Sequence, residues 1–328
     1  MPALLSASAV APSARGLLAL LALSVAGVAQ AQSTPAAEGE APAALATPSN
    51  PFRLSIGGGY AHQFATDVED APGEVSIDRA YASLSSTFGL NEDLSLGVRL
   101  AWEGGWYDFD GANPLAIGGV SPWKAVHGIQ LGARLNWTLD AQWSVGVGVF
   151  GSAAGESDAD VGDALTFGGS VSGAWRANDR FTIGAGILAS TQIEEDALII
   201  PLLIIDWRIT DAIRLSNVTG PEAYPTGAGL ELSCTALEGF DFGIGGRWES
   251  RRFRLDDEGP APEGVGEDEG LGLWLRAGIR PTDALRIDLL AGLMLGEELE
   301  LDDRDGNTIA SIELDPSPFV GAFVSFRF

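Results

Sequence analysis

The last eleven residues, Pro318–Phe328, read PFVGAFVSFRF and guide the interpretation of the whole chain. Successive side chains of a β-strand point to opposite faces. One face of this segment is therefore entirely apolar and carries Val320, Ala322, Val324, Phe326 and Phe328. The other face is mixed and carries Gly321, Phe323, Ser325 and Arg327. The pattern predicts a β-strand that separates an apolar environment from a polar one.

The composition combines two properties that rarely occur together in a soluble protein. The chain of 328 residues has a formal charge of -26, yet its mean hydropathy is +0.14. Its 43 Gly and its scarcity of Lys fit a sheet protein better than a helical one. The single Cys234 excludes an intramolecular disulfide. The acidic balance argues against a nucleic-acid partner.

The first 31 residues have the features of a secretory signal peptide. Arg15 gives a weakly basic start, Gly16–Val28 is an apolar run, and Ala29–Ala31 is an A-x-A cleavage site. A membrane-anchoring helix would need about 20 apolar residues, which this run does not supply. Residues 32–50 are rich in Ala, Pro and Ser and are interpreted as a flexible periplasmic linker.

From residue 51 to residue 328 the sequence repeats one pattern. Segments of alternating or Gly-laced apolar residues are separated in turn by short turns and by long loops. The loops contain 29 of the 45 Asp and Glu residues, so the charge lies mostly between the apolar segments. The pattern predicts fourteen strands, with twelve and sixteen as alternatives, near residues 52–64, 75–89, 94–106, 126–138, 143–152, 165–175, 181–191, 197–208, 213–218, 227–236, 240–254, 270–280, 285–295 and 318–328.

Each predicted strand has an apolar face, and aromatic residues gather near the strand ends. Beside the short turns lie Phe88, Trp137, Trp143, Trp175, Phe181, Trp207 and Phe240. Toward the long loops lie Tyr60, Phe64, Trp102, Trp106, Tyr107, Phe150, Phe167 and Trp248. Two such rows are typical of the girdles at the two interfaces of a membrane barrel. Since lipid cannot satisfy an open sheet edge, the sequence predicts an all-β, antiparallel, up-and-down transmembrane β-barrel.

The terminal aromatic strand and the strand–turn pattern resemble those of bacterial outer-membrane β-barrels, including the small monomeric porins. The run Ile200-Pro201 to Asp206-Trp207-Arg208 also resembles outer-membrane barrel families of unknown function. The resemblance implies that Phe326 and Phe328 belong to a sorting signal read by the barrel-assembly machinery. It also implies residence in a Gram-negative outer membrane, in contact with lipopolysaccharide. An apolar trimer seam is not evident, which favours a monomer.

Charged residues on the predicted lumen faces are the candidates for a pore lining. They are Arg79, Arg99, Glu103, Arg134, Arg247, Glu249, Arg276, Arg286 and Asp288, with Arg251 beside them. Opposed Arg and carboxylate rows set ion selectivity in pores, which predicts porin-like passive diffusion of small hydrophilic solutes. In the alternative interpretation these residues pair and fill a closed barrel that acts as a surface scaffold for adhesion or envelope integrity. An open pore predicts an inward constriction from the loop at 108–123 or at 296–317.

One predicted strand, at 197–208, departs from the alternating pattern. Both of its faces are apolar, with Ile199, Leu203 and Ile205 on one and Ile200, Leu202 and Ile204 on the other. It is interpreted either as a patch beneath an inward-folded loop or as a site for an apolar solute. An apolar-solute transporter is therefore the third functional hypothesis.

No catalytic residue, metal site or cofactor is predicted. The two histidines, His62 and His127, are not accompanied by a nucleophile motif, a metal-ligand cluster or a phosphate loop. Acidic loops such as Asp302–Asn307 are rich in oxygen ligands but lack the EF-hand spacing. Solvated loops and loosely bridging divalent cations both remain open there. The sequence therefore predicts a barrel that is not an enzyme.

Overall fold

The computed structural model describes residues 52–111, 113–217 and 226–328. The predicted signal peptide, residues 1–31, and the predicted linker, residues 32–50, lie outside the described residues. The strands are β1 (Phe52–Asp67), β2 (Glu74–Gly89), β3 (Leu94–Asp110), β4 (Ala125–Thr138), β5 (Trp143–Glu156), β6 (Leu165–Asn178), β7 (Phe181–Gln192), β8 (Glu195–Arg208), β9 (Ile213–Asn217), β10 (Thr226–Leu237), β11 (Phe240–Arg254), β12 (Val265–Ile279), β13 (Leu285–Asp302), β14 (Thr308–Leu314) and β15 (Ser317–Arg327).

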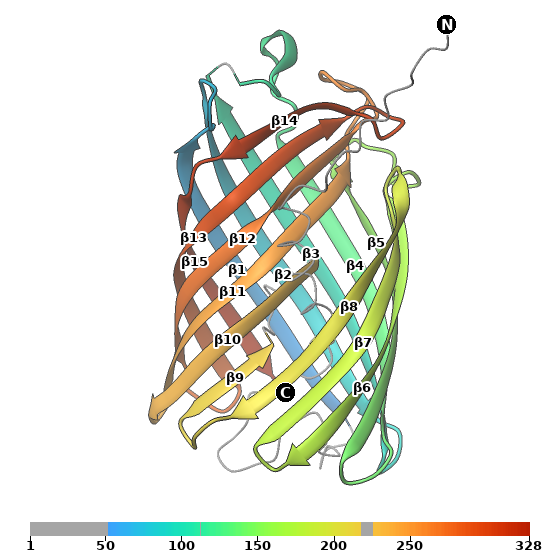
Figure 1. Ribbon diagram of the computed structural model, residues 1–328, viewed down its shortest axis with the longest axis vertical. Coiled ribbons are helices and arrows are strands. Elements are labelled where there is room, and N and C mark those ends of the chain that lie inside the picture. Colours follow the sequence, from blue (N-terminus) through green and yellow to red (C-terminus); the bar gives the residue numbers. More distant parts are fainter. Residues whose placement is uncertain (1–51, 112, 218–225) are drawn as a thin grey trace, which may run out of the picture.

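The sheet closes on itself (Figure 1). Each strand from β1 to β13 pairs antiparallel with its neighbours in sequence, β1 pairs with β15, and β15 pairs with β13. Within the described residues the wall of the barrel therefore has fourteen strands, and β14 is an additional strand on the outer part of β13. The predicted fold is confirmed. No helix in this part of the chain is long and apolar enough to cross a membrane.

The two largest differences from the predicted strands lie at the long-loop end. β13 continues to Asp302, whereas the predicted strand stopped at residue 295. β14 lies where a loop was predicted, with Leu299 of β13 opposite Ile312. The extension of β13 alternates leucines with glutamates, and its density of acidic residues made it look like a loop. In β14, Ile312 and Leu314 alternate with Ser311 and Glu313. In Figure 1, β14 runs across the upper end of the barrel, away from the short turns.

Because side chains alternate along each strand, the wall has an apolar outer face and a charged inner face. The outward positions carry exposed apolar residues such as Val149, Ile199 and Leu275, and the inward positions carry most of the arginines. The aromatic rows follow the prediction with two exceptions. Tyr107 is buried inside the barrel, and Phe150 packs against buried inward residues of β7 and β8. Both belong to the lumen rather than to a girdle.

One side of β8 is weakly connected to the rest of the wall. β9 has five residues, and its register with β8 covers only three residue pairs. Above them the Asn217 side chain continues the ladder: Nδ2 donates to the Leu203 carbonyl at 3.0 Å, and Oδ1 accepts from the Ile205 N–H at 2.8 Å. Beyond this point, among the described residues, β8 pairs only with β7, and residues 226–229 of β10 pair only with β11. We call this place, where residues 196–204 of β8 and 226–229 of β10 each have one partner strand within the described residues, the β8 seam.

Pro201 lies on this stretch of β8, which has one partner strand within the described residues. Backbone groups of successive residues in an antiparallel strand point alternately to its two edges. Because the N–H of Ile205 points toward the seam, the nitrogen of Pro201 points the same way. Proline has no N–H to leave unpaired, which is why it is confined to edges of sheets.

A ladder of glutamates covers the outer extensions of β12, β13 and β14, beyond the aromatic row of the long-loop side. The register places Glu267 opposite Glu300, Glu269 opposite Glu298, and Glu298 opposite Glu313. Like charges in directly opposed positions destabilise a sheet. Burial, followed by the carboxylates of Glu267 and Glu298, raises the pKa of Glu269 to about 7. Burial and neighbouring carboxylates likewise raise the pKa of Glu300 to about 7.

Candidate functional site

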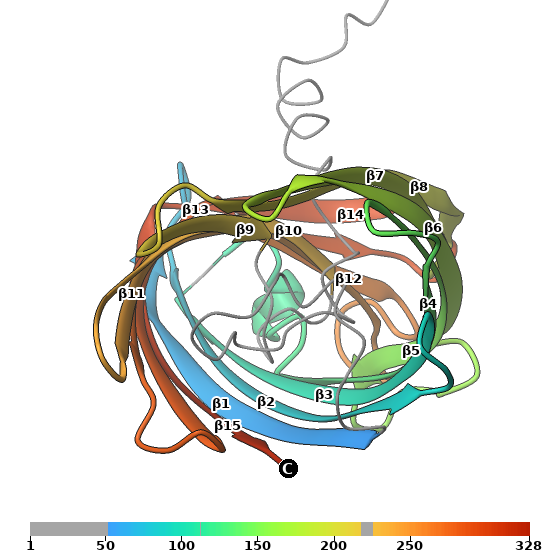
Figure 2. The same ribbon diagram turned by 90° about the horizontal axis from the view of Figure 1, so that it is seen from below.

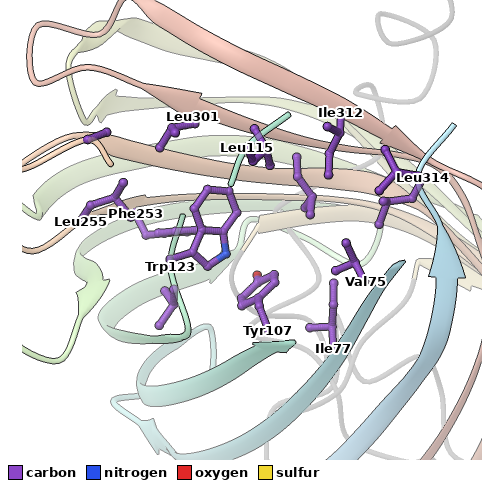
Figure 3. Close-up of a cluster of buried hydrophobic side chains, with 14 residues drawn as sticks. Val75, Ile77, Tyr107, Leu115, Trp123, Phe253, Leu255, Leu301, Ile312 and Leu314 are labelled. Atoms are coloured by element: carbon purple, nitrogen blue, oxygen red, sulfur yellow. The ribbon is translucent and has the colours of Figure 1, made fainter. Parts of the chain in front are cut away.

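The outer end of the lumen is filled by a cluster of buried apolar side chains, which we call the apolar cap (Figure 3). Both segments proposed as constrictions contribute to it: the connection from β3 to β4, and the outer part of β13 with β14. The members of the cap are Val68, Val75, Ile77, Tyr107, Leu115, Trp123, Val126, Phe253, Leu255, Ala261, Leu299, Leu301, Ile312 and Leu314.

The connection between β3 and β4 turns over the mouth of the barrel. Gly118 and Gly119 have φ angles of 68° and 79°, which glycine adopts at little cost because it lacks a Cβ. Figure 2, which views the barrel from below, shows the 3-10 turn at Ile117–Gly119 over the interior of the ring. On either side of this turn, Leu115 and Trp123 are almost completely buried.

Trp123 holds the aromatic part of the cap together. Its ring centroid lies 5.2 Å from that of Phe253, 5.5 Å from that of Phe109 and 5.9 Å from that of Tyr107, each time edge to face. This is the arrangement that the charge distribution of aromatic rings favours. The cap therefore has the packing of a protein core, and no hydrated ion can cross it without displacing these side chains.

Beneath the cap lies a set of buried polar side chains that we call the ion-pair layer. Arg79 on β2 donates to Oδ2 of Asp268 on β12 at 2.6 Å, and the Tyr107 hydroxyl donates to the same oxygen at 2.6 Å. Arg79 also donates to Oε1 of Gln63 at 3.0 Å, and Gln63 donates to Glu297. All five residues are buried.

The ion-pair layer connects β11 with β3 across the lumen. Arg251 on β11 donates to Glu103 on β3 at 2.7 Å, although five strands separate β11 from β3 along the shorter way round the ring. Arg251 also donates to Glu249, which accepts a further hydrogen bond from Arg247. Buried charges are retained only when they are paired and hydrogen-bonded, and this layer meets that condition by joining opposite walls.

The backbones of β11 and β5 also approach each other at the outer end of the barrel. β11 and β5, on opposite sides of the ring, form a parallel bridge between Arg254 and Gly155. Arg252 donates to the carbonyl of Ile193 at 2.8 Å, and Arg254 donates to Glu194, both at the tip of the β7–β8 hairpin. The β8 seam is therefore bounded by this hairpin tip toward the long loops and by β9 toward the short turns.

A second charged cluster lies lower in the lumen, along one wall. Arg276 donates to Glu231 at 2.6 Å and to Asp288 at 2.8 Å. Arg286 donates to Asp241 at 2.9 Å and to Asp288 at 2.7 Å. These residues belong to the neighbouring strands β10 to β13, so their pairing follows the wall and does not bridge the lumen.

Across from this cluster the inner wall is apolar. Leu188 on β7 and Ile200 and Leu202 on β8 are buried together, and Phe150, Leu198 and Ile204 pack against them. We call these six residues the inner apolar patch. It adjoins the β8 seam, where the outward Ile199 is 68% exposed while the inward Ile200 is 3% exposed.

The predicted pore-lining residues all occupy inward-facing positions, but they separate into different groups. Arg79, Glu103, Arg247 and Glu249 belong to the ion-pair layer, Arg276, Arg286 and Asp288 belong to the lower cluster, and Arg99 and Arg134 lie on β3 and β4 apart from both. Whether any of them lines a conducting path stays a prediction. The alternative interpretation was that these side chains pair with one another, and the structure contains such pairs.

Sequence reasoning missed four members of the ion-pair layer: Gln63, Tyr107, Asp268 and Glu297. Asp268 was placed in a loop, although it is in phase with the inward positions of the strand that follows it. Glu297 was missed because β13 was ended too early. The alternation of both segments contained the signal that would have identified them.

The two histidines lie on the outside of the barrel. His62 Nδ1 is 2.7 Å from Oδ1 of Asp78, and the Tyr60 hydroxyl donates to the same carboxylate. His127 stacks on Trp102 with 5.9 Å between ring centroids. A nucleophilic triad needs a hydroxyl or thiol hydrogen-bonded to the imidazole. The absence of enzymatic activity stays a prediction.

Comparisons with known proteins find similarity in structure only. No protein-family model matches the chain, and no curated protein matches it. An outer membrane channel from Pseudomonas putida F1 is 12% identical, with 86% of this chain and 98% of that chain covered and a TM-score of 0.47. A toluene transporter from Ralstonia pickettii is 11% identical, with 94% and 99% covered and a TM-score of 0.43. The KdgM porin is 9% identical, with 84% and 99% covered and a TM-score of 0.34. At these identities and scores, the fold is assigned from the strand order and register of the chain itself.

Proposed function

We propose that the protein is an outer-membrane channel for small, predominantly apolar solutes, which pass between lumen and bilayer at the β8 seam. The observation that carries this proposal is the position of the inner apolar patch beside the edge of β8 that, within the described residues, has no second partner strand beyond β9. Apart from this patch and the apolar cap, the described inner wall is rich in charged, hydroxyl and glycine residues.

Apolar side chains lie on both faces of β8 at this place. Ile200 and Leu202 face inward and are buried, whereas Ile199 faces outward and is exposed. A solute that leaves the patch through the seam therefore meets side chains of the same chemistry on the lipid side. Elsewhere it would have to cross a continuous backbone ladder, whose hydrogen bonds cost several kcal/mol each to break in lipid.

The apolar cap and the ion-pair layer also favour apolar solutes over hydrated ions. An apolar solute can exchange contacts with the cap residues, because both surfaces avoid water. A hydrated ion would first have to give up its water and then separate the buried pairs of the ion-pair layer. That layer is built from β1, β2, β3, β11, β12 and β13, so a path along the β5–β8 wall avoids it.

The test compares uptake of a neutral apolar dye, N-phenyl-1-naphthylamine, by bacterial cells whose surface is lipopolysaccharide. The double variant Ile200→Ser and Leu202→Ser makes the patch polar and should slow uptake relative to the wild type. Ile187→Ser is the matched control, because Ile187 lies opposite Pro201 on β7 but faces outward. Equal uptake by the double variant and the wild type, both folded as heat-modifiable barrels, would refute the proposal.

Passive diffusion of hydrophilic solutes is the second candidate function. The lower cluster and the hydroxyl-bearing positions of the inner wall favour it, because they suit water better than an apolar solute. It requires an opening of both the cap and the ion-pair layer. Ionic conductance distinguishes it from the first candidate, since only an open aqueous path carries current.

A further inference from the structure

Most inward-facing arginines of this barrel are hydrogen-bonded to carboxylates, but two on one wall are not. Among the described residues, no ion pair and no carboxylate hydrogen bond involves Arg134 on β4 or Arg176 on β6. The acidic partners of the ion-pair layer and of the lower cluster lie on other strands. Within the described residues, Arg134 and Arg176 therefore carry positive charge without an acidic partner.

Arg134 is held in place by neutral groups. Its Nε donates to Oδ1 of Asn136 at 2.9 Å, and its Nη2 donates to the hydroxyl of Ser172 at 2.7 Å. The guanidinium lies over Gly146, where a Cβ would be 2.0 Å from Nη2. The residue as a whole is 9% exposed. Its position is fixed, while its Nη1 makes no hydrogen bond to a described residue and remains a donor.

Arg176 and its neighbour give an independent sign of a missing acceptor. Nε and Nη2 of Arg176 are buried and have no hydrogen-bond partner among the described residues. The same is true of the hydroxyl of Thr182, which lies opposite Arg176 on β7 and is fully buried. Buried donors without acceptors are uncommon and costly, and a bound ion or an ordered water is one way to satisfy them.

The register places this polar group beside the inner apolar patch. Ser172 on β6 lies opposite Gly186 on β7, and Gly186 lies opposite Leu202 on β8. Gly186 offers no side chain between them. One inner surface thus combines an aliphatic half on β7 and β8 with a guanidinium and a hydroxyl on β4 and β6.

We propose that Arg134, with Ser172, forms an anion subsite that binds the carboxylate of an apolar monocarboxylic acid whose apolar part rests on the inner apolar patch. The planar end of a guanidinium offers two parallel donors, which match the two oxygens of a carboxylate. This inference rests on the proposed function, because it specifies the class of apolar solute that the same lumen accepts.

The test measures binding of two fluorescent probes that differ only in their polar group, 2-naphthoate and 2-naphthalenemethanol, to the full-length protein in lipid nanodiscs. The wild type should bind the naphthoate about tenfold more tightly than the alcohol, as expected for charge-assisted hydrogen bonds. Arg134→Gln should remove this preference and leave the affinity for the alcohol unchanged. Ser172→Ala should reduce the preference partially, and it provides a second variant if Arg134→Gln does not fold.

Arg180→Gln is the matched control, because it removes the same charge from an exposed short turn where Arg180 pairs with Asp211. It should preserve both affinities. Tight binding of the alcohol with no preference for the naphthoate would overturn the anion subsite while leaving the apolar-solute channel intact. An unchanged preference in Arg134→Gln would overturn it as well. Failure of both probes to bind would instead contradict the proposed function on which the subsite depends.

Discussion

Two Asp–Arg ion pairs of nearly equal length differ strongly in solvent exposure. Asp268 lies 2.6 Å from Arg79 with its side chain 0% exposed, and Asp211 lies 2.7 Å from Arg180 with its side chain 88% exposed. Replacing either aspartate by asparagine keeps the shape of the side chain and removes its charge. The pair of variants therefore isolates the effect of burial on an ion pair.

The expected cost follows from what remains around Arg79. In Asp268→Asn the nearest carboxylate oxygen to Arg79 is Oε1 of Glu297, at 3.6 Å, and Tyr107 loses a charged acceptor. Removing one partner of a buried ion pair costs about 3–5 kcal/mol. Because Glu297 compensates in part, we expect about 3 kcal/mol for Asp268→Asn. Asp211→Asn should cost less than about 1 kcal/mol.

Urea unfolding of the barrel in detergent micelles, followed by tryptophan fluorescence, gives both free energies of unfolding when the transitions have equal slopes. The double variant Arg79→Met and Asp268→Leu serves as a second check, since replacing a whole buried pair by apolar residues is often neutral. A loss below about 1 kcal/mol in Asp268→Asn would refute the view that the ion-pair layer is dry and closed.

Three further predictions concern the cap, the seam and the glutamate ladder. Trp123→Ala should lower the free energy of unfolding by about 3–5 kcal/mol, measured by the same urea titration; a loss near zero would mean that the cap is not packed as a core. Pro201→Ala should destabilise the barrel by about 1–3 kcal/mol, because it adds an N–H that faces the seam without a partner; unchanged or higher stability would show that this edge is paired. The raised pKa values of Glu269 and Glu300 mean that the folded extension binds protons more tightly than the unfolded chain, so its stability is greatest at low pH and is lost as the pH rises from about 4.5 through about 7. After allowance for screening by solvent we expect a loss of about 1–2 kcal/mol, visible as reduced amide-exchange protection of β14 relative to intrinsic rates, and absent when both glutamates are replaced by glutamine.

The position of the strands could be predicted because strands and tight turns are determined locally. The turn before β5 is an example. Oδ1 of Asp140 accepts hydrogen bonds from the N–H groups of Gln142 and Trp143 at 2.7 and 2.8 Å. Aspartate favours this kind of turn because its side chain accepts from the backbone two residues on, so the turn is readable from a few consecutive residues.

The direction of each side chain was also predictable, but its partner was not. Alternation places Glu103 and Arg251 inside the barrel, yet they are 148 residues apart and meet only because β3 and β11 face each other across the lumen. That distance depends on strand number and stagger of the closed barrel, which a single strand does not encode. For the same reason, the sequence left open whether these charges line a pore or close it.

The apolar cap was foreseeable only in outline. Leu115 and Trp123 are large apolar residues in a connection that would otherwise lie in water, which indicates inward folding. The partners that bury them, such as Phe253 and Leu301, come from the far end of the chain. Their meeting depends on the pinching of β11 toward β5, a feature of the tertiary structure alone.

The central claim is that the outer end of the lumen is closed to ions while the β5–β8 wall serves apolar solutes. Single-channel conductance of the purified protein in a planar lipid bilayer tests it most directly. We expect a silent membrane with the folded wild-type barrel inserted, since the described residues of the apolar cap and of the ion-pair layer pack across the outer end of the lumen. Reproducible current steps that scale with salt concentration would contradict the account and would establish diffusion of hydrophilic solutes through an open pore.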